Sequence, residues 1–188
     1  TSEVCVHHLW FTNNDYKKWG SKIKCNPAIK MQSDKDALLK ALLDNRLDII
    51  ATDHAPHTLE EKHQTYFKAP SGLPLIQHTL LAMLDFVSQQ KLSIEFMVEK
   101  MCHTPAICFQ IEKRGYIKEG YYADLVLVDL NKSHEVTSKN LQYKCGWSPF
   151  EGHKFQSSVV RTIVNGETVF ENDIVYNKTA GKRLSFLR

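Results

Sequence analysis

Apolar and polar positions divide the chain into two parts with different periodicities. In the first part, short apolar runs alternate with stretches whose apolar residues recur every three or four positions. The apolar runs predict strands at residues 3–9 and 47–52. The periodic stretches predict helices at residues 34–45, 74–89 and 93–102. Strands that alternate with helices in this way are typical of an α/β fold with a parallel sheet.

Residues at the ends of these stretches favour the same elements. Ser33 and Ser93 are predicted to cap the helices that follow them, because a serine side chain can accept a hydrogen bond from a free backbone N–H at a helix N-terminus. Thr104 and Pro105 are predicted to begin one more helix, since proline is tolerated in the first turn. The polar stretch 12–30 predicts a long loop.

Beyond about residue 112 the helical period is nearly absent, and short strands follow one another. Apolar runs predict these strands at residues 116–117, 123–130, 159–164, 168–170 and 174–176. The dipeptides at 165–166 (Asn-Gly) and 172–173 (Asn-Asp) are typical of the turns of β-hairpins. We therefore expect two domains, an α/β segment at residues 1–112 and an all-β segment at residues 113–188.

Composition and charge narrow the class of protein. The 188 residues are 43% hydrophobic and 24% charged, which is ordinary for a globular protein. The formal net charge is only +3 and the basic residues form no large block, so we expect no nucleic-acid partner. No apolar run approaches the roughly 18 residues that a membrane span needs, so we expect no membrane as a partner. Five cysteines without a CxxC pair predict reduced thiols, as in the cytoplasm. Because the chain begins within a strand pattern, we expect it to be the C-terminal portion of a longer chain.

A polar cluster stands at the end of one predicted strand. Residues 51–57 (ATDHAPH) place the carboxylate of Asp53 and the imidazoles of His54 and His57 directly after an apolar run. In α/β proteins, ligands gather at the carboxyl ends of strands. A carboxylate there can bind a cation through one oxygen and accept a proton with the other. The alternative interpretation is a capped strand end, at which Asp53 accepts hydrogen bonds from the loop and the histidines are satisfied locally.

This cluster resembles the signature of the dihydroorotases throughout its length, with four residues between it and Lys62. Residues 24–30 (KCNPAIK) resemble the KxNPPLR segment of these enzymes, and Asn26 precedes Asp53 by 27 residues, as in the family. Residues 6–9 (VHHL) resemble their TPHHL strand end. Further stretches resemble dihydroorotases or the wider amidohydrolase superfamily at residues 69–72 (APSG), 120–129 (GYYADLVLVD), 147–152 (WSPFEG) and 162–166 (TIVNG).

The resemblance implies the C-terminal part of a metal-dependent (β/α)8 barrel, plus strands of a small β-sandwich domain. Residues 1–112 would contain the last βα units and the site, and residues 113–188 the sandwich segment. The implied activity is the reversible, zinc-dependent cyclisation of N-carbamoyl-L-aspartate to L-dihydroorotate in pyrimidine biosynthesis. The resemblance further implies a small-molecule substrate, a binuclear zinc site, a homodimer and a cytoplasmic location.

The resemblance also assigns roles to individual residues. Asp53 would bind zinc and act as the catalytic acid/base, moving a proton from the attacking water to the departing amide nitrogen. Asn26 and His57 would bind the substrate, and backbone groups of Ser71 and Gly72 would close over its ring.

Other polar residues receive no such role. We interpret Lys62 as a loop charge, and His7 and His8 as side chains that pack at a strand end. The family also needs an HxH pair, and none occurs among the nine histidines of this chain. Asp53 is therefore the one zinc ligand that the resemblance supplies, and we expect the chain alone to be inactive and to lack a tight metal site.

Three alternatives stay open. A hydantoinase or allantoinase would share the barrel and the metal chemistry, although their corresponding motifs usually lack the continuation to His57. A non-catalytic, dihydroorotase-like subunit could act in assembly, although retention of Asp53, Asn26 and His57 argues against it. The chain could also be a proteolytic remnant of a larger protein.

Overall fold

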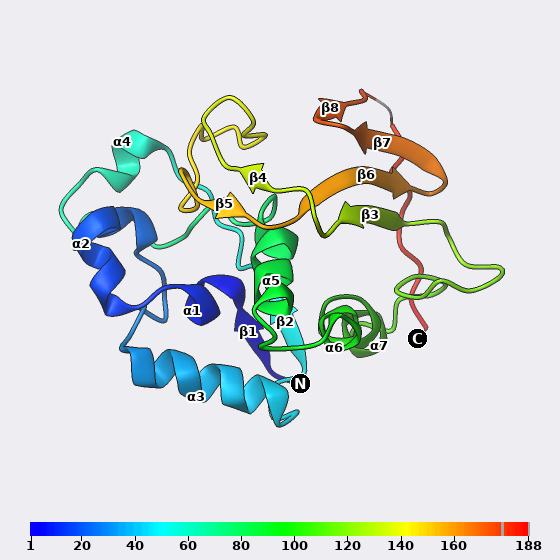
Figure 1. The fold of residues 1–188 in the computed structure, drawn as a ribbon, viewed down its shortest axis with the longest axis horizontal. Coiled ribbons are helices and arrows are strands. Elements are labelled where there is room, and N and C mark those ends of the chain that lie inside the picture. The colour runs from blue at the N-terminus through cyan, green and yellow to red at the C-terminus, as the bar shows by residue number, and fades with distance from the viewer. Residues whose placement is uncertain (178, 188) are drawn as a thin grey trace. The chain divides into compact units, whose positions relative to one another are not determined.

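The structure is a computed structural model that describes residues 1–177 and 179–187. The chain divides into two compact units, whose elements are labelled in Figure 1. One unit comprises Ser2–Met83 and Glu135–Lys154, and the other comprises Thr1, Leu84–His134 and the chain from Phe155 onward. This division follows the packing of the chain, and the predicted domain boundary at residue 112 stays a prediction.

The unit with the candidate site is built on two short parallel strands, β1 (Glu3–Cys5) and β2 (Ile49–Ala51). Val4 pairs with Ile50, and both side chains are buried. The parallel pairing confirms the α/β expectation for this part of the chain. Both strands are shorter than predicted, because an apolar run also includes buried residues beyond the paired backbone.

The run predicted as one strand at residues 3–9 changes to a helix after its third residue. Helix α1 (Val6–Trp10) follows β1 directly and buries Val6 and Leu9. These two residues lie three positions apart, a spacing that places both on one face of a helix. The strand prediction was wrong at residues 6–9, because an apolar run this short fits both the two-residue period of a strand and the 3.6-residue period of a helix.

The stretch 12–30, predicted as a loop, contains three short helices. They are η1 (Asn13–Asp15), α2 (Tyr16–Trp19) and η2 (Gly20–Ile23). The first begins where the backbone N–H of Thr12 donates a 2.7 Å hydrogen bond to Asp15 Oδ2. Elements of three or four residues are too short to show a helical period, so the sequence pattern missed them.

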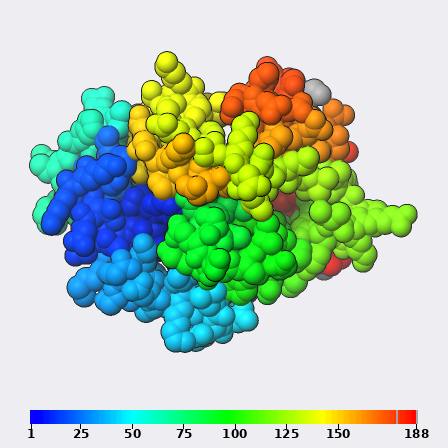
Figure 2. Space-filling model, in the orientation of Figure 1, coloured from blue at the N-terminus to red at the C-terminus, as the bar shows by residue number. Residues whose placement is uncertain are grey.

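The predicted helix at 34–45 is confirmed as α3 (Gln32–Leu43), which begins two residues earlier. Met31 is its N-cap, and the backbone N–H of Met31 donates a 3.0 Å hydrogen bond to Asp34. The predicted Ser33 cap is therefore wrong. Figure 2 shows α3 and the short helices before it at the surface of their unit.

A further short helix, α4 (Leu59–Lys62), lies in the loop after β2. Thr58 caps it by accepting a 3.2 Å hydrogen bond from the backbone N–H of Glu61. Two-residue strands β4 (His134–Glu135) and β5 (Lys154–Phe155) form a small sheet that the sequence pattern did not predict.

The predicted helix at 74–89 is confirmed, over a shorter range, as α5 (Thr79–Ser88). Next come α6 (Ile94–Val98), the π-helical turn η3 (Glu99–His103) and α7 (Thr104–Cys108). The Ser93 cap is confirmed, because the Ser93 hydroxyl accepts a 3.1 Å hydrogen bond from the backbone N–H of Phe96. The helix predicted to begin at Thr104 is also confirmed.

The other unit contains an antiparallel sheet with strand order β3-β6-β7-β8. Its strands are β3 (Leu125–Asp129), β6 (Ser158–Val164), β7 (Glu167–Glu171) and β8 (Ile174–Val175). Both predicted hairpin turns are confirmed, with positive φ at Asn165, Gly166, Asn172 and Asp173. Residues 116–117 form no strand, and the Tyr116 ring instead stacks on His103 at a centroid distance of 4.2 Å. None of the helices in the described part of the chain is both long and apolar enough to cross a membrane.

Candidate active site

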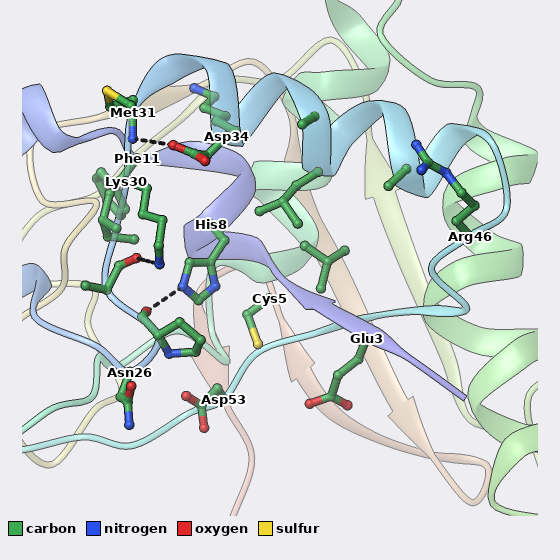
Figure 3. A pocket seen from close by; sticks show the side chains of 18 residues that line it. Glu3, Cys5, His8, Phe11, Asn26, Lys30, Met31, Asp34, Arg46 and Asp53 are labelled. Carbon is green, nitrogen blue, oxygen red and sulfur yellow. Dashed lines mark hydrogen bonds between the residues drawn. The ribbon is translucent and has the colours of Figure 1, made fainter.

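Asp53 follows β2 at the point where the chain leaves the sheet. Its φ is +45°, a left-handed conformation that is uncommon outside glycine but is more accessible to aspartate than to most residues. Its exposed side chain lines a cavity of about 730 Å³ together with Asn26, Cys5 and His8 (Figure 3). The structure therefore brings Asp53 and Asn26, two of the predicted site residues, to the same cavity.

This cavity has a negative electrostatic character near the end of β1. Burial, the Asp53 carboxylate and the Glu3 carboxylate together raise the pKa of the Cys5 thiol to about 12. Burial likewise raises the pKa of the Cys25 thiol to about 11. Both thiols are protonated at neutral pH, so neither is an activated nucleophile.

The segment that presents Asn26 is held by backbone contacts. The carbonyl oxygen of Pro27 accepts hydrogen bonds from His8 Nε2 at 2.8 Å and from Cys25 Sγ at 3.1 Å. The carbonyl oxygen of Lys24 accepts a 2.9 Å hydrogen bond from the backbone N–H of Gly72. These contacts fix the backbone on both sides of Asn26 and leave its amide side chain exposed at the cavity.

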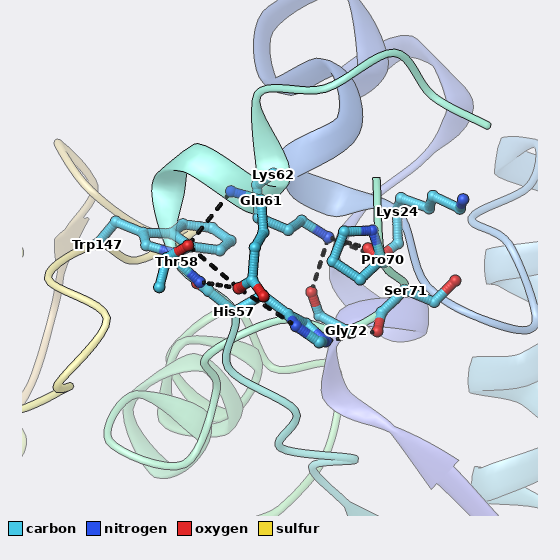
Figure 4. Close-up of polar contacts among 9 residues, drawn as sticks. All are labelled: Lys24, His57, Thr58, Glu61, Lys62, Pro70, Ser71, Gly72 and Trp147. Carbon is cyan, nitrogen blue, oxygen red and sulfur yellow. Dashed lines mark hydrogen bonds and ion pairs between the residues drawn. The ribbon is translucent and has the colours of Figure 1, made fainter. Parts of the chain in front are cut away.

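His57 contacts the second predicted group, Ser71 and Gly72 (Figure 4). Its Nε2 donates a 3.1 Å hydrogen bond to the carbonyl oxygen of Ser71, and its Nδ1 lies 3.7 Å from Glu61 Oε2. The indole N–H of Trp147 donates a 2.7 Å hydrogen bond to the carbonyl oxygen of His57. Trp147 is buried, so this bond anchors the backbone of His57 to the core.

Gly72 lies so close to the β2 exit loop that no other residue fits without a shift. Its φ is +134°, and a Cβ built there would lie 2.5 Å from the carbonyl oxygen of Ala55 and 3.2 Å from Cδ2 of His57. The absence of a side chain thus allows the Ser71-Gly72 backbone to pack directly against His57.

Lys62 joins the loop to the Asn26 segment. Its side chain is fully buried, and Nζ donates hydrogen bonds to the carbonyl oxygens of Pro70 and Gly72 at 2.9 Å and of Lys24 at 3.2 Å (Figure 4). Burial lowers the pKa of Lys62 to about 8, so the amine remains charged at neutral pH. Each of the three N–H groups of the Lys62 ammonium thus has a carbonyl acceptor.

The interpretation of Lys62 as a loop charge was therefore wrong. The available signal was its place at the end of a capped helical turn, where Thr58 and Glu61 form a capping box. That turn directs the lysine inward. The charge of Lys62 alone favoured an exposed side chain, because lysine is almost never fully buried unless its ammonium is paired.

His54 lies apart from Asp53 despite being next to it in sequence. Its Nδ1 accepts hydrogen bonds from the backbone N–H groups of Leu75 at 3.0 Å and Ile76 at 3.3 Å. It lines a second cavity of about 470 Å³ that also includes His57. Asn26 and Asp53 thus line one cavity and His57 the other, and the Lys62 contacts connect the segments that carry them.

Comparison with known protein families identifies the chain as an amidohydrolase. The chain belongs to the Amidohydrolase family, whose model matches residues 3–169. The match confirms the expected amidohydrolase fold, which includes part of a (β/α)8 barrel.

The chain is similar to curated dihydroorotases in particular. It is 37% identical over 175 residues to the dihydroorotase of Halobacterium salinarum, covering 93% of this chain and 41% of that protein. It is 39% identical over 182 residues to the dihydroorotase of Pyrococcus abyssi, covering 97% and 43%. The resemblance to dihydroorotases inferred from the motifs is confirmed, and the chain spans about two fifths of the length of these relatives.

Solved structures of related enzymes share the fold. The L-hydantoinase (dihydropyrimidinase) of Arthrobacter aurescens matches with a TM-score of 0.88 and 28% identity, over 93% of this chain and 40% of that enzyme. A D-hydantoinase (dihydropyrimidinase) from Thermus sp. matches with a TM-score of 0.85 and 21% identity, over 95% and 41%. At 21% identity, the second likeness concerns the fold alone.

Proposed function

We propose that this chain carries part of the active site of a dihydroorotase, a cyclic amidohydrolase that interconverts N-carbamoyl-L-aspartate and L-dihydroorotate in pyrimidine biosynthesis. The observation that carries the proposal is the shared cavity of Asp53 and Asn26 at the carboxyl end of β2. Identity of 37–39% to two curated dihydroorotases supports this choice of substrate.

The donors around this cavity fit a zinc ion. Its lining includes the carboxylates of Asp53 and Glu3, and carboxylate oxygens are donors that zinc accepts. In the proposed role Asp53 would hold the ion through one carboxylate oxygen. When bound, zinc would polarise the reacting carbonyl and lower the pKa of water toward about 7 from about 15.7.

The second oxygen of Asp53 would move the proton. In hydrolysis it accepts a proton from the attacking water and returns it to the amide nitrogen as the ring opens; cyclisation reverses these transfers. A carboxylate serves both roles because its two oxygens are separate acceptors. The exposed position of Asp53 at the cavity leaves room for the substrate beside it.

The remaining residues would bind the substrate. The Asn26 amide offers both a donor and an acceptor, which suits a ring amide or a carboxylate. His57 lines the second cavity in this structure, so it would have to give up its hydrogen bond to Ser71 and turn toward the Asp53 cavity to reach the substrate carboxylate. The backbone of Ser71 and Gly72 would then close over the ring, held from behind by Lys62.

A hydantoinase-type activity is the second candidate, favoured by the L-hydantoinase likeness at 28% identity. A chimeric enzyme would distinguish dihydroorotase activity from hydantoinase activity. The matched region of the Pyrococcus abyssi dihydroorotase is replaced by this chain, and zinc-loaded protein is assayed with carbamoyl-aspartate, dihydroorotate and hydantoin. We expect turnover of the first two substrates alone, whereas turnover of hydantoin would favour the second candidate.

Two variants of the chimera test the assigned role. Asp53→Asn is expected to lower kcat by about 10²–10⁴-fold, the usual contribution of a general acid/base. Asp36→Asn, an exposed change on α3, is the matched control and should leave kcat unchanged. A folded chimera without cyclisation activity would contradict the proposal and favour the non-catalytic subunit. Full activity in Asp53→Asn would instead contradict the role assigned to Asp53.

The 188-residue chain assayed alone with zinc is expected to give no turnover, because Asp53 is the single zinc ligand that the resemblance assigns within it. A homodimer and a cytoplasmic location are part of the same proposal. Sedimentation of the chimera would test whether it is a homodimer.

A further inference from the structure

Three metal-binding side chains meet where β1 passes into α1. Cys5 is the last residue of β1, and His7 and His8 lie in α1. One ligand atom of each residue lies within 4.8 Å of the ligand atoms of the other two. The two imidazole rings are 4.2 Å apart between centroids.

His7 gives an independent reason to look for a ligand. Its side chain has no exposed surface, and neither ring nitrogen has a hydrogen-bond partner among the residues that the structure describes. A buried imidazole without partners is costly, because it loses its hydrogen bonds to water and gains none in return. Burial lowers the pKa of His7 to about 3, so the ring is neutral and one nitrogen has a free lone pair.

His8 is oriented as metal-binding histidines commonly are. Its Nε2 must be the donor in the 2.8 Å hydrogen bond to Pro27, because a carbonyl oxygen only accepts. That bond fixes the tautomer and leaves Nδ1 with a free lone pair. Figure 3 shows the His8 ring and the Cys5 side chain on the same side of the cavity.

Two carboxylates act on the Cys5 end of this cluster, and the cavity is also lined by Lys30, Lys35 and Arg46. The carboxylates of Asp53 and Glu3 line the same cavity as Cys5 and His8. Their negative charge at this end of the cavity attracts a divalent ion.

We propose that Cys5, His7 and His8 bind a zinc-type divalent cation at a site separate from the one assigned to Asp53. A thiolate and two imidazoles are ligands that zinc prefers, and three protein ligands leave its fourth position open. Zinc bonds of about 2.0–2.3 Å set the donor atoms roughly 3.5 Å apart, which small side-chain rotations can reach. On binding, the Cys5 S–H bond breaks, a sulfur–metal bond forms and the proton leaves to solvent.

This site does not depend on the proposed dihydroorotase activity. It revises the sequence-based view of His7 and His8 as packing residues alone, and the expectation of a chain without a tight metal site. Its test is therefore a binding measurement on the 188-residue chain, with no enzymatic readout.

Cobalt(II) is the probe, because it replaces zinc and its bond to thiolate sulfur absorbs in the near ultraviolet. Titration of metal-free chain with Co²⁺ is expected to give this band with one equivalent bound. Cys5→Ser should abolish the band, and His8→Asn should weaken binding at least about tenfold. Zinc should displace the cobalt and remove the band.

Two control variants separate this site from its neighbours. Cys25→Ser removes the other thiol near His8, whose Sγ lies 3.8 Å from Nε2, and should keep the band. Asp53→Asn should also keep it, since Asp53 is not among the proposed ligands.

Alkylation gives a second measurement that needs no variant. At alkaline pH, where a fraction of the Cys5 thiol is ionised and reacts with iodoacetamide in the metal-free chain, zinc should protect Cys5, with the modified residue located by mass spectrometry. Absence of the band, its survival in Cys5→Ser, its loss in Asp53→Asn or unprotected Cys5 would each overturn the proposal.

Discussion

The Lys62 ammonium donates a 2.9 Å hydrogen bond to the carbonyl oxygen of Gly72 from a fully buried position. Two further bonds, to Pro70 and Lys24, satisfy the other N–H groups. A single buried charge thus holds the loop proposed to cover the substrate against the segment that presents Asn26.

Replacing Lys62 by methionine removes this charge while keeping a long unbranched side chain. Three carbonyl groups, one buried and two partly buried, then lose their partner, so we expect the free energy of unfolding to fall by about 3 kcal/mol. Urea unfolding of the 188-residue chain measures the change. Lys68→Met, at an exposed position of the same loop, is the control and should be nearly neutral. Equal stability of the two variants would show that the Lys62 contacts contribute little.

Gly72→Ala tests the close approach of the loop to the β2 exit. The new Cβ would lie 2.5 Å from the Ala55 carbonyl oxygen in a backbone conformation with positive φ. We expect a loss of about 3 kcal/mol in the free energy of unfolding, from strain and overlap together. Gly20→Ala also has positive φ but meets no atom within 4 Å, so it isolates the conformational cost of about 1–2 kcal/mol. A smaller effect at Gly72 than at Gly20 would contradict the described packing.

Asn26→Ala should weaken substrate binding more than it slows the chemical step. An amide that binds a charged substrate group contributes about 1.5–3 kcal/mol, which corresponds to a KM increase of roughly 10–150-fold. Steady-state kinetics of the chimera measures KM and kcat separately. Asn14→Ala, exposed and outside the cavity, is the control. If kcat alone fell, Asn26 would act in the reaction step instead of in binding.

Trp147→Phe keeps the buried aromatic surface but removes the indole N–H that donates to the His57 carbonyl at 2.7 Å. The unpaired carbonyl should lower the free energy of unfolding by about 1–3 kcal/mol. Trp19→Phe, at a half-buried position, is the comparison and should cost less. Thermal unfolding of both variants gives the difference. A Trp147 variant as stable as the Trp19 variant would mean that water replaces the lost donor.

Sequence pattern predicted the elements that have strong local signals. Strand β2 followed from an apolar run, α3 from its helical period, and the turn at Asn165 and Gly166 from residues that accept positive φ. The cluster around Asp53 was found because its polar residues come directly after a buried strand.

The rest depended on contacts between distant residues. The change from β1 to α1 at Val6 breaks an apolar run that fits either element, and only packing decides between them. Lys62 is buried because carbonyl groups from two other segments surround its ammonium; the capped turn at Thr58 indicates the direction of the side chain, but only these distant contacts explain its burial. The separation of His57 from Asp53 into two cavities likewise arises from the path of the loop after β2.

Among the described residues, the Lys62 ammonium donates to main-chain oxygens of two segments, so it fixes the path of these segments without depending on the side chains they carry. Relatives can therefore exchange the side chains at positions 24, 70 and 71 and still keep the same loop path. Substrate preference could therefore change through the side chains at these positions while the buried Lys62 ammonium keeps the loop path.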